Sequence, residues 1–409
     1  MKNQERDDIQ HIQQANQPYD YVIIGGGMAA DYAAKGIWEQ DKMGTIKILS
    51  ADVDAPYTRP ALTKKLWTDD DFTEDQVSLT TEETGAEIEL ETVVTAINRD
   101  MHTVQLEDST IIGYTKLLLA TGSEPAKIDG PEDERTIFFR NWTDYRKLRK
   151  FSGNNRHILV IGGGYIGAEL AAGLVQNQTK VTLIYPDKIL GSKQFPEEIA
   201  KEYEAAFQKA GVTLVNGKRA SSYRKEDDKL VLTLDDGTEL EGDAIVSGLG
   251  ASPRVSLAKE SGLKVEDGVV VDEYLRTEDA DIYAAGDIAA YPDAILGRTQ
   301  IGHVDHARHS GKAVGKVMAG ANEPYTHTPY FYSVVFDISW KAIGTLDPQL
   351  DTLIDPVGNG KVVYYLKDAK PAGVLLWNVE ADLDAVRKIL SDPPSDLVAL
   401  KGAIQEKEA

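Results

Sequence analysis

Two short runs of apolar, mostly β-branched residues are each followed directly by glycines. The first run covers Tyr19–Ile24 and the second covers His157–Ile161, and a segment with the mixed apolar and polar spacing of a helix follows each glycine turn. After the second helical segment comes another apolar run, Lys180–Tyr185. Short apolar runs bounded by glycine predict buried strands, and the order strand, helix, strand predicts parallel α/β units.

The two glycine turns have the spacing of a dinucleotide-binding fingerprint. Residues 25–30 read GxGxxA and residues 162–167 read GxGxxG, and their first glycines are 162 − 25 = 137 residues apart. In such a turn the first glycine permits the tight bend, the second lets a pyrophosphate approach the backbone, and the small third residue lets helix and strand pack closely. One copy is a weak signal. Two copies in the same context predict two bound dinucleotides, or one dinucleotide and one vestigial site.

Three further apolar runs along the chain end in glycine. They are Leu117–Gly122, which ends in Ala-Thr-Gly, Asp243–Gly248, and Asp281–Gly286, which is followed directly by Asp287. We interpret all three as buried strands of the same sheets. The last of these strands would deliver Asp287 at its carboxyl end.

Length and charge narrow the class of protein. At roughly 150 residues per domain, 409 residues suggest two or three domains. The hydrophobic fraction of 42% is enough to build cores, and the formal charge is 44 − 66 = −22. A field of that sign repels phosphate backbones and anionic headgroups, which excludes nucleic acid as a general partner and membrane binding through a basic surface. No apolar run reaches the roughly 18 residues of a membrane span.

The chain contains no cysteine. This excludes a structural disulfide, a redox-active thiol pair, a thiolate nucleophile and a cysteine-ligated zinc or iron–sulfur site. It also fits a reducing compartment. Residues 1–18 are polar, lack the apolar core of a signal peptide and contain acids that transit peptides avoid, so we expect a flexible tail and a cytoplasmic protein.

The order of these motifs resembles a known family. GxGxxA, ATG, GxGxxG and YAAGD follow one another as in the two-dinucleotide-binding-domain flavoproteins, which include glutathione reductase and ferredoxin reductase. Within them the chain closely resembles the apoptosis-inducing factor and ferredoxin reductase-like branch, on the segments Pro56–Trp67, Gly302–Gly315 and Gly373–Asn378. The resemblance covers about residues 19–400 and implies that FAD and NAD(P)H are bound.

The resemblance also implies an architecture. It is an α/β fold with two Rossmann-like dinucleotide-binding domains, as in glutathione reductase, and a C-terminal α+β domain that covers the flavin. We expect strands around Lys361–Leu366 and Gly373–Trp377, followed by a helix from Asp382. The expected limits are 1–18 for the tail, 19–130 and 244–322 for the FAD domain, 131–243 for the NAD(P)H domain, and 323–409 for the C-terminal domain.

Three residues receive catalytic roles by the resemblance. Lys64 aligns with a lysine beside the flavin, and Glu169 aligns with its salt-bridge partner, which would hold the ammonium and offset its burial. The alternatives are a solvated surface lysine, as Lys65 is expected to be, and an exposed helical acid. His303 is expected close to the isoalloxazine, at the start of a helix in Gly302–Gly320 whose N-terminus would face the flavin ring.

Further residues are carried over as ligands of the two cofactors. The FAD ligands implied are Gly25, Gly27, Ala29, Ala30, Asp52, Arg59, Lys64, Val94, Ala120, Thr121, Gly122, Arg140, Gly286, Asp287, His303, Val304 and Tyr332. The NADH ligands implied are Gly162, Gly164, Ile166, Gly167, Glu169, Asp187, Lys193 and Gly250.

Some of these positions depart from the family pattern or leave an alternative open. Asp52 would replace a glutamate expected after Ser50, where the chain has Ala51. Tyr332 replaces a flavin-side tryptophan and is otherwise a core aromatic residue. Lys193 is otherwise a solvated loop lysine.

Asp187 indicates the choice of nicotinamide cofactor. It matches the acid that binds the ribose 2′- and 3′-hydroxyls and would repel a 2′-phosphate, which favours NADH over NADPH. The neighbouring Lys188 leaves NADPH open.

The segment after Gly302 also carries the spacing of a possible metal site. His303, Asp305, His306 and His309 place histidines at i, i+3 and i+6. The resemblance uses this segment for flavin, so we expect no metal there.

The sequence therefore predicts an FAD-dependent NAD(P)H oxidoreductase. NADH would reduce the flavin, and electrons would pass without a protein thiol to an external acceptor, namely a small carrier protein, a quinone or another small oxidant. The acidic chain disfavours an acidic ferredoxin unless a local basic patch exists. The alternative is a redox-controlled binding module with slow NADH oxidation and a stable charge-transfer complex of reduced flavin and NAD⁺. A homodimer is possible under either hypothesis.

Overall fold

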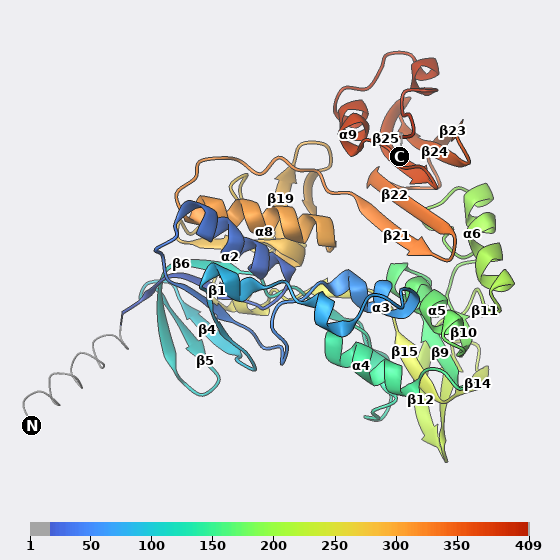
Figure 1. Ribbon diagram of the computed structural model, residues 1–409, viewed down its shortest axis with the longest axis horizontal. Helices are drawn as coiled ribbons and strands as arrows, with labels where there is room; N and C mark the ends of the chain where they lie inside the picture. Colours follow the sequence, from blue (N-terminus) through green and yellow to red (C-terminus); the bar gives the residue numbers. More distant parts are fainter. Residues whose placement is uncertain (1–16, 408–409) are drawn as a thin grey trace, which may run out of the picture.

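The computed structural model describes residues 17–407. The expected tail, residues 1–18, lies outside the described residues except for Gln17 and Pro18. Figure 1 shows three groups of elements, with the N-terminal strands and α8 on the left, α4, α5 and their strands at the lower right, and the C-terminal sheet at the upper right.

The first sheet has a parallel centre, ordered β3-β2-β1-β6 with β18 on the far side of β6. Its parallel strands are β1 (Tyr19–Ile24), β2 (Ile46–Leu49), β3 (Glu87–Glu89), β6 (Ile111–Leu119) and β18 (Ile282–Ala284). The start of β6 also pairs antiparallel with a hairpin, β5 (Thr103–Leu106) and β4 (Val94–Asn98). The central strands are buried on both faces, which explains their continuous apolar sequences.

Two helices pack tightly together against this sheet. They are α2 (Met28–Gln40), which follows the first glycine turn, and α8 (Val304–Met318), which comes from a distant part of the chain. A Cβ added at Gly36, Gly311 or Gly315 would lie 2.3, 2.5 or 2.1 Å from a backbone oxygen of the partner helix. The two helix backbones therefore touch, and only glycine fits at these three crossing points.

The second sheet is parallel, in the order β11-β10-β9-β15-β8. Its elements in chain order are β8 (Thr136–Phe138), α4 (Trp142–Phe151), β9 (His157–Ile161), α5 (Tyr165–Gln176), β10 (Lys180–Ile184), α6 (Glu197–Lys209), β11 (Thr213–Val215) and β15 (Ala244–Ser247). An antiparallel sheet packs beside it, formed by β12 (Ala220–Glu226), β13 (Lys229–Leu234) and β14 (Glu239–Gly242).

The C-terminal sheet is antiparallel, in the order β21-β22-β25-β24-β23. Its strands are β21 (Phe331–Val335), β22 (Ile338–Gly344), β23 (Asp351–Val357), β24 (Gly360–Lys367) and β25 (Lys370–Trp377). One face contributes Trp340 and Trp377 to the core of the second sheet, where both contact Phe195, and the other face packs on α9 (Leu383–Ser391). The two strands and the helix that the sequence predicts in this region are present.

The remaining elements are short. They are the turns of helix η1 (Arg59–Leu62), η2 (Glu74–Val77), η3 (Thr81–Thr84), η4 (Gly286–Ile288) and η5 (Leu397–Leu400), the short helices α3 (Lys65–Thr68) and α7 (Ser256–Glu260), and the strands β7 (Ser123–Pro125), β16 (Ala251–Pro253), β17 (Val269–Val270), β19 (Ala289–Asp293) and β20 (Gly297–Gln300). Among them β17, β19 and β20 form one small sheet and β7 and β16 another.

The chain leaves the first sheet after β6, forms the second sheet, and returns to the first with β18. The fold class predicted from the sequence, two parallel dinucleotide-binding sheets with a C-terminal α+β part, is confirmed. The exact domain limits stay predictions. Within residues 17–407, no helix has both the length and the apolar character that a membrane crossing requires.

Candidate functional site

A single cavity of about 1390 Å³ extends from the first glycine turn to the second. The predicted FAD-side residues that line it are Gly25, Gly27, Ala29, Asp52, Arg59, Lys64, Val94, Ala120, Thr121, Gly122, Arg140, Asp287, His303, Val304 and Tyr332. The predicted NADH-side residues that line it are Gly162, Gly164, Ile166, Glu169, Asp187, Lys193 and Gly250. The fold thus brings residues from widely separated stretches of the chain around one space.

Three predicted ligands lie behind the cavity wall and pack instead. Ala30 is fully buried within α2. A Cβ at Gly167 would lie 1.8 Å from the carbonyl oxygen of Gly162, and a Cβ at Gly286 would lie 2.9 Å from the Cβ of Ala29. Because these three residues are small, the backbone segments that line the cavity can pack closely against one another. Any effect of these residues on a ligand is therefore indirect.

The two glycine turns share the same local geometry. Gly25 and Gly162 have φ angles of +121° and +107°, which favour glycine. A Cβ on them would lie 2.1 and 2.5 Å from the carbonyl oxygens of Ala120 and Gly248, each just past the end of the neighbouring strand. Both turns therefore pass directly over the sheet edge, which leaves room for a ligand on their outer side.

Each turn leads into a helix whose N-terminal amides remain free of side-chain caps. The N-cap residues are Gly27 for α2 and Gly164 for α5, and neither has a capping side chain. Both residues line the cavity. Uncapped helix N-termini carry partial positive charge and unpaired N–H donors, which suits the pyrophosphate of a dinucleotide at each end of the cavity.

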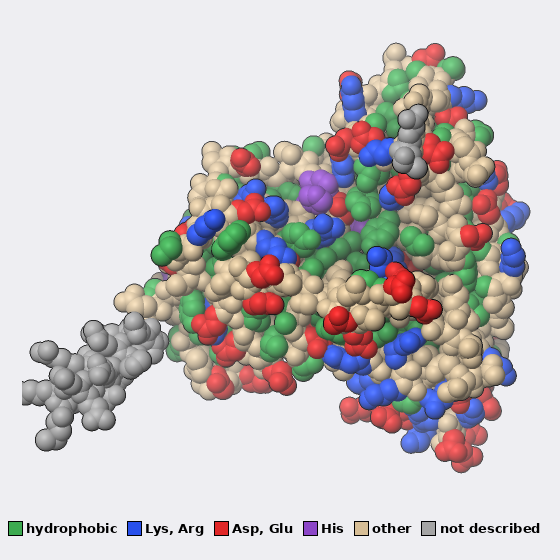
Figure 2. Space-filling model, viewed as in Figure 1, with side chains coloured by type: hydrophobic (Ala, Val, Ile, Leu, Met, Phe, Trp, Pro, Cys, Tyr) green, Lys and Arg blue, Asp and Glu red, His purple; other side chains and the backbone are tan. Residues whose placement is uncertain are grey.

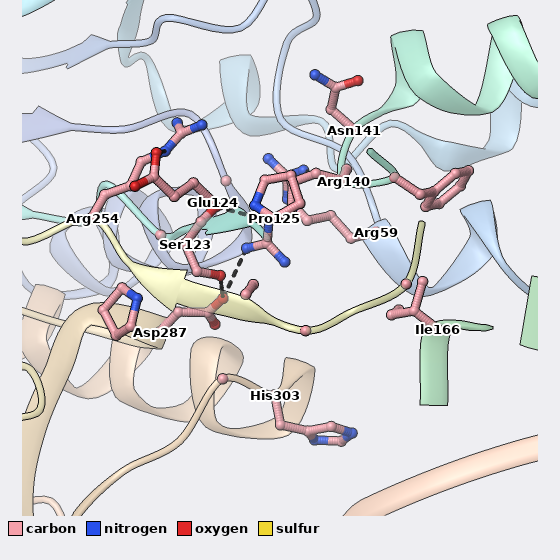
Figure 3. A pocket seen from close by; sticks show the side chains of 18 of the residues that line it. Arg59, Ser123, Glu124, Pro125, Arg140, Asn141, Ile166, Arg254, Asp287 and His303 are labelled. Atoms are coloured by element: carbon pink, nitrogen blue, oxygen red, sulfur yellow. Dashed lines mark hydrogen bonds and ion pairs between the residues drawn. The ribbon is translucent and has the colours of Figure 1, made fainter. Parts of the chain in front are cut away.

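Asp287 lies where two donors from other elements converge on it (Figure 3). Ser123 Oγ donates to Asp287 Oδ2 at 2.7 Å, and Arg140 Nη2 donates to the same oxygen at 2.8 Å. Burial alone would raise the pKa of Asp287, but Arg140, Ser123 and the nearby Arg59 together lower it. The carboxylate is thus kept charged on the wall of the cavity. Sequence reasoning missed Ser123, although it directly follows the Ala-Thr-Gly motif.

The centre of the cavity holds an ion pair between the two dinucleotide-binding parts. Lys64 Nζ lies 2.8 Å from Glu169 Oε2, with side-chain exposures of 17% and 2%. Thr63 Oγ1 donates to the same oxygen at 2.5 Å, and Ser333 Oγ donates to Oε1 at 2.6 Å. The structure forms the contact that the family resemblance implies. It also adds the two hydroxyl donors, which sequence reasoning missed although each lies next to a predicted residue.

Tyr332 and His303 complete the surroundings of the lysine. Lys64 Nζ lies 4.9 Å from the centre of the Tyr332 ring, and the rings of His303 and Tyr332 meet edge to face at 5.8 Å. His303 is the N-cap of α8, and its Nδ1 accepts from the Asp305 amide at 3.3 Å. Burial lowers the pKa of His303 to about 4, against the opposing effect of Asp305. This imidazole is therefore neutral at physiological pH.

The two acids proposed to bind ribose have different surroundings. Asp52 lines the cavity, and it also accepts from the Tyr57 hydroxyl at 3.2 Å and lies 3.7 Å from Arg59. Asp187 follows β10 at the other end of the cavity, 3.7 Å from Lys193. The Asp187 backbone carbonyl accepts from the Gly217 amide at 3.0 Å, but among the described residues its side-chain carboxylate has no donor closer than this lysine. The carboxylate is therefore available to the hydroxyls of a ligand.

The histidines of α8 do not form the cluster that their spacing suggests. His303 lines the cavity, whereas His306 is fully buried and its Nδ1 lies 3.0 Å from the Tyr325 hydroxyl. His309 lies beside Asp305 and contacts His327, which comes from outside the helix. The N-cap histidine and the two histidines within α8 thus face three different environments.

Comparisons with known proteins show what the chain is similar to. The family model described as pyridine nucleotide-disulphide oxidoreductase matches residues 19–311. Apoptosis-inducing factor 1 of Dictyostelium discoideum is 31% identical and covers 91% of this chain and 78% of its own. Monodehydroascorbate reductase of Pisum sativum is 30% identical over 92% of this chain and 95% of its own. A chain in the solved covalent putidaredoxin reductase–putidaredoxin complex superposes with a TM-score of 0.84 at 26% identity, over 92% of this chain and 94% of that one.

Proposed function

Because the chain belongs to the pyridine nucleotide-disulphide oxidoreductase family, we propose that it carries electrons from NADH through FAD to an external acceptor. The chain is an FAD-dependent NAD(P)H oxidoreductase of the ferredoxin reductase type. NADH as the donor and direct delivery to an outside acceptor are the proposal. Direct delivery is supported by the absence of cysteine, because no protein thiol is available to relay electrons.

One observation supports this function most strongly. A single cavity joins two phosphate-binding turns, and the Lys64–Glu169 ion pair lies between them. Bound FAD supplies the redox chemistry by accepting hydride from the nicotinamide and releasing electrons to the acceptor. The protein's task is to hold both dinucleotides with their reactive ends together at this ion pair.

The residues around the ion pair have separate roles in the proposal. Glu169 holds the Lys64 ammonium at the centre of the cavity, where a positive charge favours the gain of negative charge on reduction. Tyr332 covers the ammonium and limits its access to water. Neutral His303 borders the same space without adding a second positive charge. Asp287 and the two glycine turns fix the rest of the cofactors.

Anaerobic titration of the purified holoprotein with NADH tests the proposed function. Loss of the oxidised flavin absorbance, followed by rapid reoxidation with a carrier protein or a quinone, is the expected result. A persistent long-wavelength band with slow reoxidation by every acceptor would instead support the redox-sensor alternative. The similarity to an apoptosis-inducing factor is the reason for considering this alternative. No loss of absorbance with NADH would contradict the proposal.

Replacing Asp187 should weaken the preference for NADH. We expect Asp187→Ser to lower the NADH/NADPH ratio of kcat/KM roughly tenfold, equivalent to about 1.4 kcal/mol. Serine cannot accept hydrogen bonds from both ribose hydroxyls, and it does not repel a 2′-phosphate. Lys193, which lies 3.7 Å from the carboxylate of Asp187, stays in place in the variant. Steady-state kinetics with both donors measure the ratio. Asp228→Ser, which removes an exposed acid outside the cavity, is the matched control, and an unchanged ratio in Asp187→Ser would contradict this assignment.

The acidic chain carries a local basic surface next to the segment that contains Lys64. Helix α4 has four basic residues and one acid, and Lys147, Arg149 and Lys150 are exposed. Arg149 lies 4.8 Å from the ring of Trp67, which belongs to α3 directly after Lys64. Figure 2 shows Lys and Arg side chains gathered over α4 in the lower part of the view. We propose this surface as the docking site for an acidic small redox protein, which the neighbour solved with putidaredoxin also supports.

Charge reversal on α4 tests this acceptor. The double variant Lys147→Glu/Lys150→Glu should lower kcat/KM for an acidic iron–sulfur carrier about tenfold at low salt, because steering depends on complementary charge. Its rate with a neutral quinone should not change. Lys367→Glu/Lys370→Glu, with the same charge change on exposed residues of the C-terminal sheet, is the control. Equal effects of the two double variants would argue against α4 as the docking site.

A homodimer and a cytoplasmic location stay predictions from the sequence.

A further inference from the structure

Three side chains outside the cavity come together at the start of α8. Asp305 lies in the first turn of the helix, His309 lies one turn later, and His327 belongs to the segment between α8 and β21. His327 Nε2 is 2.6 Å from Asp305 Oδ2, and His309 Nδ1 is 3.2 Å from Asp305 Oδ1. One nitrogen or oxygen from each residue lies within 4.8 Å of the other two.

The identities of these side chains suit a transition metal. Two imidazoles and one carboxylate are ligands for zinc and similar divalent ions, whereas calcium and magnesium prefer oxygen alone. Ligand atoms around tetrahedral zinc lie roughly 3.3 Å apart, given metal–ligand distances near 2 Å. His309 Nδ1 already lies at about this distance from Asp305 Oδ1, and His327 Nε2 would have to move less than about 1 Å away from Oδ2, so each histidine is spaced from a different oxygen of the carboxylate.

The carboxylate is fixed in place and lacks a permanent cation. Asp305 is only 5% exposed in its side chain, and the Tyr330 amide donates to its Oδ2 at 3.2 Å. Within residues 17–407 its ion-pair partners are His309 and His327, with no lysine or arginine. A buried carboxylate between two histidines needs a compensating positive charge, which either a metal ion or a proton could supply.

The site is also open to solvent on one side. The side-chain exposures of His309 and His327 are 47% and 21%, and their rings stack at 3.7 Å. Figure 2 shows histidine side chains at the molecular surface near the middle of the view. An ion could therefore enter from water and keep water in its remaining coordination positions.

We propose that Asp305, His309 and His327 bind one divalent first-row transition-metal ion, for which Zn²⁺ is the fitting example. Such an ion would tie α8, whose N-cap residue His303 lines the cofactor cavity, to the segment that leads into Tyr330 and Tyr332. It would thereby hold the entry of the C-terminal sheet against the helix on the flavin side. This inference does not depend on the nature of the electron donor or acceptor.

Zinc binding to the FAD-loaded protein tests the proposal. After chelator treatment and desalting, calorimetric titration with ZnCl₂ should show saturation at one ion per chain, and zinc should raise Tm. Cobalt(II) should bind the same site and give ligand-field bands beyond the flavin absorption. His309→Ala and His327→Ala should each weaken zinc binding by more than roughly 100-fold, while keeping the flavin spectrum.

The control variant is His102→Ala. It removes another partly exposed histidine that lies near one carboxylate, Asp281, at 3.7 Å, and it should bind zinc like the unchanged protein. Unaltered zinc affinity in both His309→Ala and His327→Ala would place the ion elsewhere and overturn the proposal. Absence of saturable zinc and cobalt binding, with a Tm that does not respond to metal, would mean that the three groups share only a proton and would overturn it as well.

Discussion

The Glu169→Ala variant should reduce its flavin with NADH roughly 100-fold more slowly than the unchanged protein. This ratio of rates corresponds to about 2.7 kcal/mol of activation free energy, close to the roughly 3 kcal/mol that is the lower end of what it costs to break a buried ion pair by removing one partner. Without the carboxylate, the Lys64 ammonium loses its partner at 2.8 Å, and the Thr63 and Ser333 hydroxyls lose their acceptors. The lysine is then free to turn away from the centre of the cavity.

Stopped-flow absorbance under anaerobic conditions measures this rate once the flavin content of the variant has been checked. The rate of flavin reduction in Glu169→Gln should lie between those of Glu169→Ala and the unchanged protein. Glutamine keeps an oxygen that accepts from a hydroxyl, but it removes the negative charge. Lys65→Ala, which removes the exposed lysine next to Lys64, should reduce its flavin like the unchanged protein. If Glu169→Ala keeps FAD and reduces it at the normal rate, the ion pair has no part in hydride transfer.

The second large effect is expected at Asp287. We expect Asp287→Ala to be purified largely without flavin, with an FAD affinity at least about 100-fold lower, equivalent to about 2.7 kcal/mol. Asp287 is the charged partner of Arg140 at 2.8 Å, and Arg59 lies close enough to add a second positive charge. Removing the carboxylate leaves the neighbouring guanidinium groups of Arg140 and Arg59 without its negative charge and frees the Ser123 hydroxyl.

The ratio of visible to protein absorbance and a fluorescence titration of the apoprotein with FAD measure this effect. Glu124→Ala is the control, because Glu124 lines the same cavity (Figure 3) but is exposed and lies 4.0 Å from its nearest cationic partner, Arg254. Normal flavin content in Asp287→Ala would show that the carboxylate is not needed to hold FAD.

The sequence predicted the two glycine turns because their chemistry is local. A strand, a tight turn and a helix follow one another within a few residues, so the spacing from Gly25 or Gly162 already contains the geometry. The Lys64–Glu169 contact spans 105 residues, and only the family resemblance indicated it. The hydroxyls of Thr63 and Ser333 were missed, because serine and threonine are common and their role depends on which oxygen the fold places beside them.

The cluster at Asp305 shows the same limit more sharply. Helical spacing put His309 next to Asp305, but the third member, His327, lies beyond the end of α8. Its position depends on the path by which the chain crosses back over the helix before β21, and no periodicity in the sequence describes that path. The basic surface on α4 is an intermediate case. Its residues follow one another in the sequence and could be recognised there, but the contact of Arg149 with Trp67 depends on the fold.

The backbone contact between α2 and α8 has a consequence for how this chain can vary. Gly36 is 311 − 36 = 275 residues from Gly311, yet the crossing allows no side chain at either one. A larger residue in one helix would clash with backbone atoms of the partner helix. No side-chain substitution in the partner helix can remove these backbone atoms. The two positions therefore cannot exchange compensating changes, and variants that separate the helices should fail to accumulate as folded protein even when every cofactor ligand is intact.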